Sequence, residues 1–245
     1  MTSKRQCGVR SAQCGARTSA FIGIVLGSGL FLLAAAPAGE AVETAPVVTS
    51  SAVSIMTNTS AADRVLAIEA HYRDLTDLTA KVVQRNFLKS VDKTQTFEGT
   101  LSIKKPGKLR LEYTNGQVIV VDGKEAWFYS KKSEQVIRRT FKDFEQANIP
   151  VAFLLGAGAI RQDFDVSVPE GGGEGVLDLV PKKAGAAMQK LRLHTIEAGR
   201  ISRMIVFDRS GNQSDIRFSE VRENAGIDDK PFRFKVPKGT EIIEQ

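Results

Sequence analysis

The sequence is poor in the side chains that most often carry out chemistry. Its 245 residues include two cysteines, two histidines and one tryptophan. Both cysteines, Cys7 and Cys14, lie close to the N-terminus, and neither His71 nor His194 has a second ligand at the spacing of a metal site. The chain has no G-x-S-x-G motif, and its "GGGEG" run lacks the Lys and Ser/Thr of a phosphate-binding loop. We therefore expect no catalytic residue, no metal site and no cofactor.

The first 38 residues have the pattern of an export signal. A basic leader without an acidic residue precedes an apolar run, Phe21 to Ala36, and the small residues Ala36-Pro37-Ala38 follow. This order predicts a Sec-type signal peptide that is cleaved after Ala38, so the product is soluble and exported. An uncleaved membrane anchor is the alternative, although the run is shorter than the roughly 20 residues that a spanning helix needs.

Loss of this leader changes the charge balance. Four of the 34 Lys and Arg residues lie in residues 1–38, which leaves 30 basic against 28 acidic residues and a net charge of +2. The basic residues also lack the interleaved aromatic residues of a base-stacking surface. We therefore expect no nucleic-acid partner. Neither cysteine remains after cleavage, so the product has no disulfide and no thiolate ligand.

The rest of the chain divides into an arm and one domain. Residues 39–60 are small and rich in hydroxyl groups, which predicts a flexible arm. Residues 61–245 are enough for one domain with a core. Ser60 is a candidate N-cap for a helix from Ala61, whose apolar stripe contains Val65, Ile68 and Leu75.

Beyond Leu78 the pattern changes to that of β-strands. In "FEGTLSIKKPGKLRLEY", residues 97–113, apolar and polar side chains alternate, as in strands with one buried face. Asn115-Gly116 and Asp122-Gly123 are strong hairpin signals, and further turn sequences separate a second series of strands. Helical turns are expected at 142–148 and after Pro150. We predict a mainly β (α+β) fold, an antiparallel meander with short helices.

The surplus of apolar side chains on one sheet face allows two readings. A short apolar segment that folds over this face would make a container for a lipid, because lipid sites are apolar with few polar anchors. Alternatively, the helices fill the face completely and the core is solid. The pattern alone leaves both open.

Five stretches of the sequence resemble one family. They are "FEGTLSIKKPGKLRLEY", "VIVVDGKEAWFYSKKSEQV", "PVAFLLG", "FDRSGNQSDIRFSEV" and "FRFKVPKG". In this order they are similar to the periplasmic lipoprotein carrier family, LolA, over roughly residues 62–243. The resemblance implies an incomplete, strongly curved antiparallel β-barrel with a helical lid over an apolar cavity. It also implies a monomeric periplasmic carrier of acylated lipoproteins. An inner-membrane ABC transporter supplies its cargo and an outer-membrane acceptor receives it, without covalent chemistry.

The resemblance also assigns roles to residues. The family usually has Arg-Pro at Lys105-Pro106, and that Arg is implied to hold the lid closed, so Lys105 is the expected latch, shared with Arg110. Lysine lacks the planar fork of arginine. The lid candidates are Phe153, Leu154 and Leu155. The cavity candidates are Leu101, Ile103, Leu109, Leu111, Tyr113, Val118 and Val120.

Three other functions stay open at this point. The same sheet occurs in stress-signalling regulators, although these carry a second C-terminal domain. A carrier or sensor of another lipid, such as a glycolipid, would have the same apolar features. An enzyme of unrecognised type is the third possibility.

Overall fold

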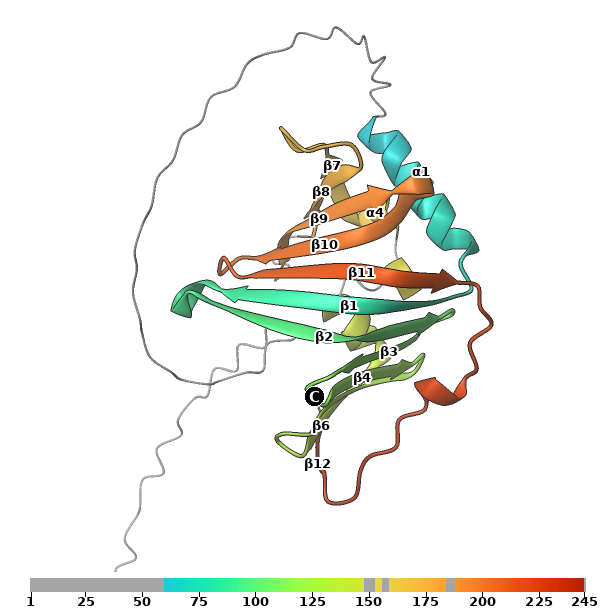
Figure 1. Ribbon diagram of the computed structural model, residues 1–245, viewed down its shortest axis with the longest axis vertical. Coiled ribbons are helices and arrows are strands. Elements are labelled where there is room, and N and C mark those ends of the chain that lie inside the picture. The colour runs from blue at the N-terminus through green and yellow to red at the C-terminus, as the bar shows by residue number, and fades with distance from the viewer. Residues whose placement is uncertain (1–59, 148–152, 156–158, 184–187, 245) are drawn as a thin grey trace, which may run out of the picture.

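One large β-sheet with short helices packed against it forms the fold (Figure 1). The computed structural model describes residues 60–147, 153–155, 159–183 and 188–244. In these residues twelve strands pair in the order β12-β6-β5-β4-β3-β2-β1-β11-β10-β9-β8-β7. All neighbours are antiparallel except β12 and β6, which are parallel. The two edge strands, β12 and β7, do not pair with each other, so the barrel is incomplete, as expected.

The elements follow one another along the chain with short connections. The strands are β1 Asp77–Leu88, β2 Lys93–Lys104, β3 Lys108–Tyr113, β4 Gln117–Asp122, β5 Glu125–Ser130, β6 Gln135–Thr140, β7 Phe164–Ser167, β8 Val176–Pro181, β9 Met188–Ile196, β10 Arg200–Asp208, β11 Gln213–Glu223 and β12 Glu241–Glu244. The helices are α1 Ala61–Asp74, η1 Lys89–Val91, α2 Phe141–Ala147, η2 Phe153–Leu155, α4 Ile160–Asp163, η3 Glu197–Gly199 and η4 Lys230–Phe232.

Helix α1 begins where its sequence predicts. The Ser60 hydroxyl accepts a hydrogen bond from the Asp63 N–H at 3.1 Å, which satisfies one of the free donors of the first turn. The predicted stripe is buried, and it includes Val65 and Ile68 together with Tyr72. Through this stripe α1 packs against β10 and η3 at one end of the sheet (Figure 1).

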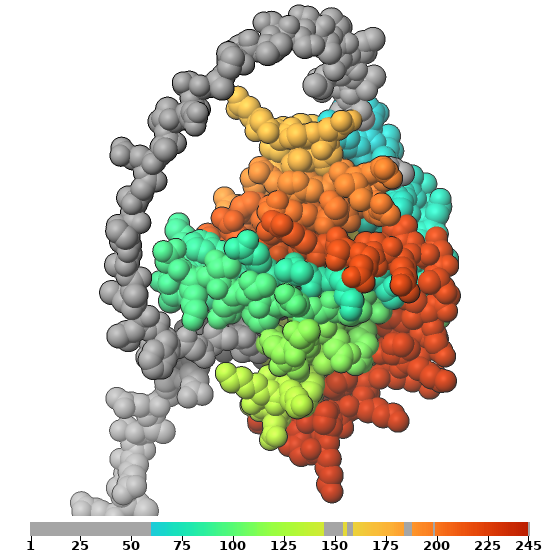
Figure 2. All heavy atoms as spheres, viewed as in Figure 1, coloured from blue at the N-terminus to red at the C-terminus, as the bar shows by residue number. Residues whose placement is uncertain are grey.

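The sheet has two faces that the strand register defines. We call one of them the inner face. It carries Leu101, Ile103, Leu109 and Tyr113, all of which are buried. Buried side chains of α1, α2, η2 and α4 lie on this side, including Phe144, Leu155 and Ile160. We call the opposite side the outer face; in Figure 2 the strands β1 and β2 present it to the viewer.

A C-terminal segment, residues 224–240, covers part of the outer face. Helix η4 contacts β3 and β4, and Phe232 is fully buried. The Phe234 ring lies 6.0 Å from Trp127 and 6.1 Å from Tyr129, centroid to centroid. Both faces of β4 are therefore covered, which explains why this strand is an apolar run instead of an alternating one.

The expected helices are present within the limits of the description. Helix α2 coincides with the turn expected at residues 142–148 up to Ala147, and η2 lies within the segment expected after Pro150. Pro150 itself and residues 184–187 lie outside the described residues. Among the helices that the structure describes, none combines the length and hydropathy needed to cross a membrane.

Candidate functional site

The inner face brings together most of the apolar residues expected in the cavity. Leu101 pairs with Leu111, and Ile103 pairs with Leu109, so these four side chains share one face of β2 and β3. Tyr113 continues the row opposite Gly99. Leu101, Ile103, Leu109 and Tyr113 are buried, whereas Leu111 is partly exposed.

Two of the expected residues lie on the other face. Arg110 pairs with Val120, and Glu112 pairs with Val118, so both valines point away from Leu109 and Leu111. The inner positions of β4 are Ile119 and Val121 instead. The expectation for Val118 and Val120 is therefore wrong in its parity. Because residues 118–121 are all apolar, no alternation along this strand indicates which side chains face inward.

Helix η2 lies over the inner face. Leu154 and Leu155 are buried in the same hydrophobic core as Leu101 and Ile103. The N–H of Gly107, in the turn between β2 and β3, donates a hydrogen bond to the Leu155 carbonyl at 3.4 Å. Phe153 belongs to η2, but its side chain lies outside the description. Through Leu154 and Leu155, η2 therefore covers part of the inner face.

Lys105 holds α1. Its ammonium group donates a hydrogen bond to the Tyr72 carbonyl in the last turn of α1, and its N–H donates to the Thr76 carbonyl at 2.8 Å. A cation at this place complements the partial negative charge of a helix C-terminus. Burial lowers the pKa of the Lys105 ammonium, and the nearby Asp74 carboxylate opposes this shift. The described bond between this turn and η2 comes from Gly107, not from the lysine side chain.

Arg110 lies on the outer face, away from η2. Its guanidinium group donates to the Pro231 carbonyl at 3.3 Å and to the Glu112 carboxylate at 2.8 Å and 3.0 Å. Arg110 therefore fixes the C-terminal segment against β3. The expectation that it shares the latch is wrong, because residue 110 has the parity opposite to Leu109 and Leu111.

The inner face also carries polar groups, and Gln84, Asn86 and Ser214 among them are not predicted site residues. The Tyr113 hydroxyl donates to Gln84 Oε1, and Gln84 Nε2 donates to Asn86 Oδ1 at 2.9 Å. The Ser214 hydroxyl donates to the same Asn86 oxygen at 2.8 Å. A signal was present, because Gln84 and Asn86 continue the period-2 series Leu78, Ala80 and Val82 on β1.

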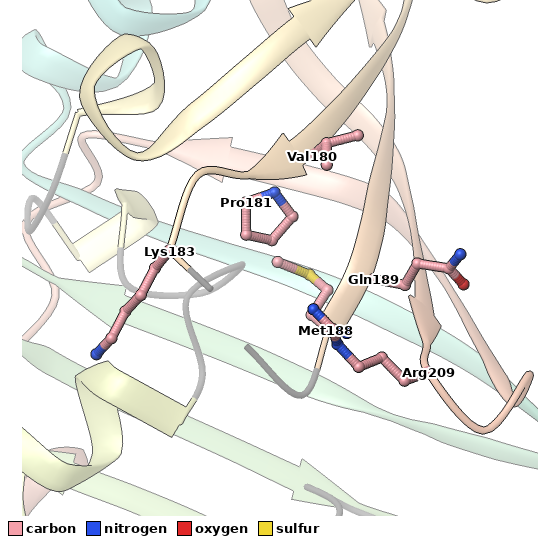
Figure 3. A pocket seen from close by; sticks show the side chains of 6 residues that line it. All are labelled: Val180, Pro181, Lys183, Met188, Gln189 and Arg209. Carbon is pink, nitrogen blue, oxygen red and sulfur yellow. The ribbon is translucent and has the colours of Figure 1, made fainter. Parts of the chain in front are cut away.

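Two hollows lie elsewhere on the described surface. One of about 360 Å³ lies where β8 ends and β9 begins, and Figure 3 shows Pro181 beside Met188 with Lys183 and Arg209 on two sides. A larger groove of about 860 Å³ crosses the outer face from Lys81 on β1 to Tyr129 on β5. Both have mixed polar and apolar walls.

The two histidines lie on different elements and have different neighbours. His71 Nε2 lies 3.0 Å from the Glu223 carboxylate at the surface of α1. His194 lies on the outer face beside Arg203, and burial together with Arg203 and Arg192 lowers its pKa. Within the described ranges no three His, Cys, Asp or Glu side chains come close enough to hold a metal ion.

Comparison with known proteins now gives the inner face a context. Residues 73–235 match the family model described as outer membrane lipoprotein carrier protein LolA. An outer-membrane lipoprotein carrier protein of Pseudomonas aeruginosa is 31% identical over 173 residues, 69% of this chain and 81% of that protein. The Azotobacter vinelandii carrier is also 31% identical, over 69% of this chain and 82% of its own length. A crystal structure of a LolA superfamily protein from Nitrosomonas europaea aligns with a TM-score of 0.43 at 15% identity, over 71% of this chain and 98% of that one. The chain belongs to the outer membrane lipoprotein carrier family, LolA.

Proposed function

We propose that this protein is a periplasmic carrier that shelters the acyl chains of lipoproteins between two membranes. The observation that carries the proposal is an apolar inner face covered by a short, separate helix, in a chain of the LolA family. An inner-membrane ABC transporter supplies the cargo, and an acceptor at the outer membrane takes it over. The protein acts as a monomer and catalyses no reaction.

Solvation energy explains why such a carrier is needed. Each buried methylene contributes roughly 0.8 kcal/mol, so one long acyl chain in water costs on the order of 10 kcal/mol. Leu101, Ile103 and Leu109 offer a surface that replaces water around the chain. In the described arrangement Leu154 and Leu155 occupy that surface. Cargo and η2 therefore compete for the same face, and this competition permits release.

A release assay tests the proposal. Mature protein, beginning near Gly39, is added to spheroplasts that hold a labelled outer-membrane lipoprotein in the inner membrane. We expect label in the supernatant in a one-to-one complex with the protein. If no label is released although a fluorescent acyl probe binds, the cargo is another lipid. If no label is released and the acyl probe does not bind either, the apolar face is a solid core, and a regulator of the same fold becomes the better description.

Two matched variants assign the result to the inner face. Leu111→Glu places a charge at a partly exposed position of the inner face, between Leu109 and Tyr113, whereas Val118→Glu places the same charge on the outer face of the next strand. We expect Leu111→Glu to lose cargo and Val118→Glu to keep it, because a carboxylate is costly beside an acyl chain. Equal activity of both folded variants would contradict the assignment.

A further inference from the structure

The inner face changes its chemistry along β1. From Leu78 through Ala80 to Val82 the inward side chains are apolar, and the next two inward positions are Gln84 and Asn86. Gln84 pairs with Phe97 and Ile216, and Asn86 pairs with Gln95 and Ser214. One end of the face is thus apolar, and the end near the β1–β2 hairpin is polar.

The polar end is as deeply buried as the apolar core. Gln84 is 3% exposed, Asn86 is 1% exposed and Tyr113 is 3% exposed. Their hydrogen bonds run from the Tyr113 hydroxyl through Gln84 to Asn86. Every group in this series of hydrogen bonds is uncharged. Burial raises the pKa of the Tyr113 hydroxyl, so the hydroxyl stays a neutral donor. Buried polar groups of this kind need partners to offset their lost hydration.

A glycine makes room for this arrangement. Gly99 on β2 lies between Tyr113 on β3 and Val82 on β1. A Cβ atom at Gly99 would come within 2.5 Å of the Glu112 carbonyl oxygen, closer than such atoms approach in proteins. Because β2 has no side chain in this row, the Tyr113 hydroxyl crosses it and reaches Gln84.

The hydrogen-bonding capacity of the polar end is not filled. A glutamine amide has two N–H donors, and Gln84 Nε2 uses one of them on Asn86. The Tyr113 hydroxyl donates to Gln84, and its oxygen accepts no bond from the described residues. Among the described residues, one buried N–H of Gln84 and the buried hydroxyl oxygen of Tyr113 are therefore available to a ligand.

We propose that Gln84 and Tyr113, supported by Asn86, form a subsite for the neutral polar end of the cargo lipid, an ester or amide carbonyl with or without a neighbouring hydroxyl. This inference rests on the proposed function. The acyl chain then extends along the inner face toward Ile103 and Leu109. Six residues of β1 separate Leu78 from Gln84, about 20 Å of strand, which is comparable with a long acyl chain.

The subsite favours a neutral head over a carboxylate. The groups that bond Gln84 and Tyr113 in the structure are amides and hydroxyls, without a cation. A carboxylate at this depth would lose its hydration without gaining an opposite charge, whereas a carbonyl oxygen needs one N–H donor. Ester and amide oxygens beside an acyl chain meet this requirement.

Displacement binding to mature wild-type protein at pH 8 tests the subsite. Diphenylhexatriene reports the apolar face, and 1-palmitoylglycerol and palmitate, which share their acyl chain, compete with it. We expect 1-palmitoylglycerol to bind at least tenfold more tightly than palmitate. Tyr113→Phe and Gln84→Met each remove one polar contact and are expected to reduce this preference about tenfold.

The control and the contradicting outcomes separate the two proposals. Thr100→Val changes an exposed residue on the outer face of β2 and should leave the affinities for 1-palmitoylglycerol and for palmitate unchanged. If diphenylhexatriene binds but the wild type does not distinguish the two lipids, the subsite is overturned and the carrier stands. If none of the three ligands binds, the proposed function fails. If Gln84→Met does not fold, the subsite is still tested by the preference of the wild type for 1-palmitoylglycerol over palmitate and by its reduction in the near-isosteric Tyr113→Phe.

Discussion

Tyr72 joins the first helix to the sheet through its hydroxyl and through its backbone carbonyl. Its ring is buried on α1, and its hydroxyl oxygen accepts a hydrogen bond from the Ile201 N–H of β10 at 3.1 Å. Ile201 is itself buried, so that N–H depends on this oxygen. The same residue offers its carbonyl to Lys105, and one residue thus connects α1 with two separate parts of the sheet.

We expect Tyr72→Phe to lower the free energy of unfolding by about 1–3 kcal/mol, because it leaves the buried Ile201 N–H without its acceptor. Urea unfolding at neutral pH measures the change. Tyr129→Phe is the control: Tyr129 is partly exposed on the outer face, and its loss should cost less than about 0.5 kcal/mol. Equal effects of the two variants would remove the special role of Tyr72.

The difference in the free energy of unfolding between the wild type and Tyr72→Phe should depend on pH. Burial raises the pKa of Tyr72 from 10.0 to about 12, although the Ile201 N–H bond opposes the shift. Between these values the unfolded chain has lost this proton and the folded chain keeps it, so rising pH favours unfolding. The advantage of the wild type over Tyr72→Phe should therefore be complete below pH 10 and should shrink from pH 10 toward 12. Urea unfolding at pH 8, 10 and 11 measures it, and a constant difference would contradict the assignment.

Lys105 offers a second test of a single side chain. Lys105→Met removes the donor to the Tyr72 carbonyl, so the last turn of α1 should fray and its amide hydrogens should exchange faster. Lys105→Arg keeps a cationic donor and should exchange at nearly the wild-type rate. Hydrogen exchange resolved by residue is the measurement. Unchanged exchange in Lys105→Met would show that the bond does not hold the helix.

Among the elements, the short helix η2 matters most for access to the inner face. It spans three residues, yet two of them are buried in the main core, and one backbone bond from Gly107 fixes it to the sheet. So short a helix has little stability of its own. Its position therefore depends on the apolar contact with the inner face, which is the surface that the proposed cargo needs.

We expect Leu155→Ala to increase the affinity for an acyl probe. The substitution removes buried methyl groups from the covered arrangement, at a cost of about 2–4 kcal/mol, and leaves the sheet residues that contact cargo unchanged. A smaller cost of displacing η2 then appears as tighter binding and slower release. Titration with a fluorescent fatty acid and a transfer assay measure the two effects.

Leu66→Ala is the matched control, since Leu66 is 44% exposed on α1 and away from the inner face. It should change neither affinity nor release. A Leu155→Ala protein that is less stable but binds the probe with wild-type affinity would show that η2 does not compete with cargo.

Over the whole molecule, regular patterns were predictable and contacts across the sheet were not. Alternation from Phe97 to Tyr113 and the two hairpin signals placed β2 to β5 correctly, because each depends on neighbouring residues. The prediction for Val120 is wrong because the C-terminal segment, more than a hundred residues later, buries the outer face as well. No local period records such a cover.

The candidate site follows the same division. Leu101, Ile103 and Leu109 share a face that their parity predicts. The partner of Lys105 was not predictable, since Tyr72 lies 33 residues earlier and the bond is to its backbone carbonyl. The polar pair Gln84 and Asn86 was visible in the sequence as two polar residues in an inward series, but only the register shows that Tyr113 and Ser214 meet them.

The extent of the domain is the last prediction. Ser60 caps α1, and the sheet, its inner cover and the C-terminal segment all follow it, so we expect residues 60–245 to fold alone. Their free energy of unfolding should equal that of the chain from Gly39 within about 0.5 kcal/mol, if residues 39–59 are a flexible arm. Adding Ser60→Ala to the shorter chain should cost about 1 kcal/mol, because the Asp63 N–H loses its acceptor. Urea unfolding of the three proteins measures both effects. A large loss on removing residues 39–59 would place the arm within the folded domain.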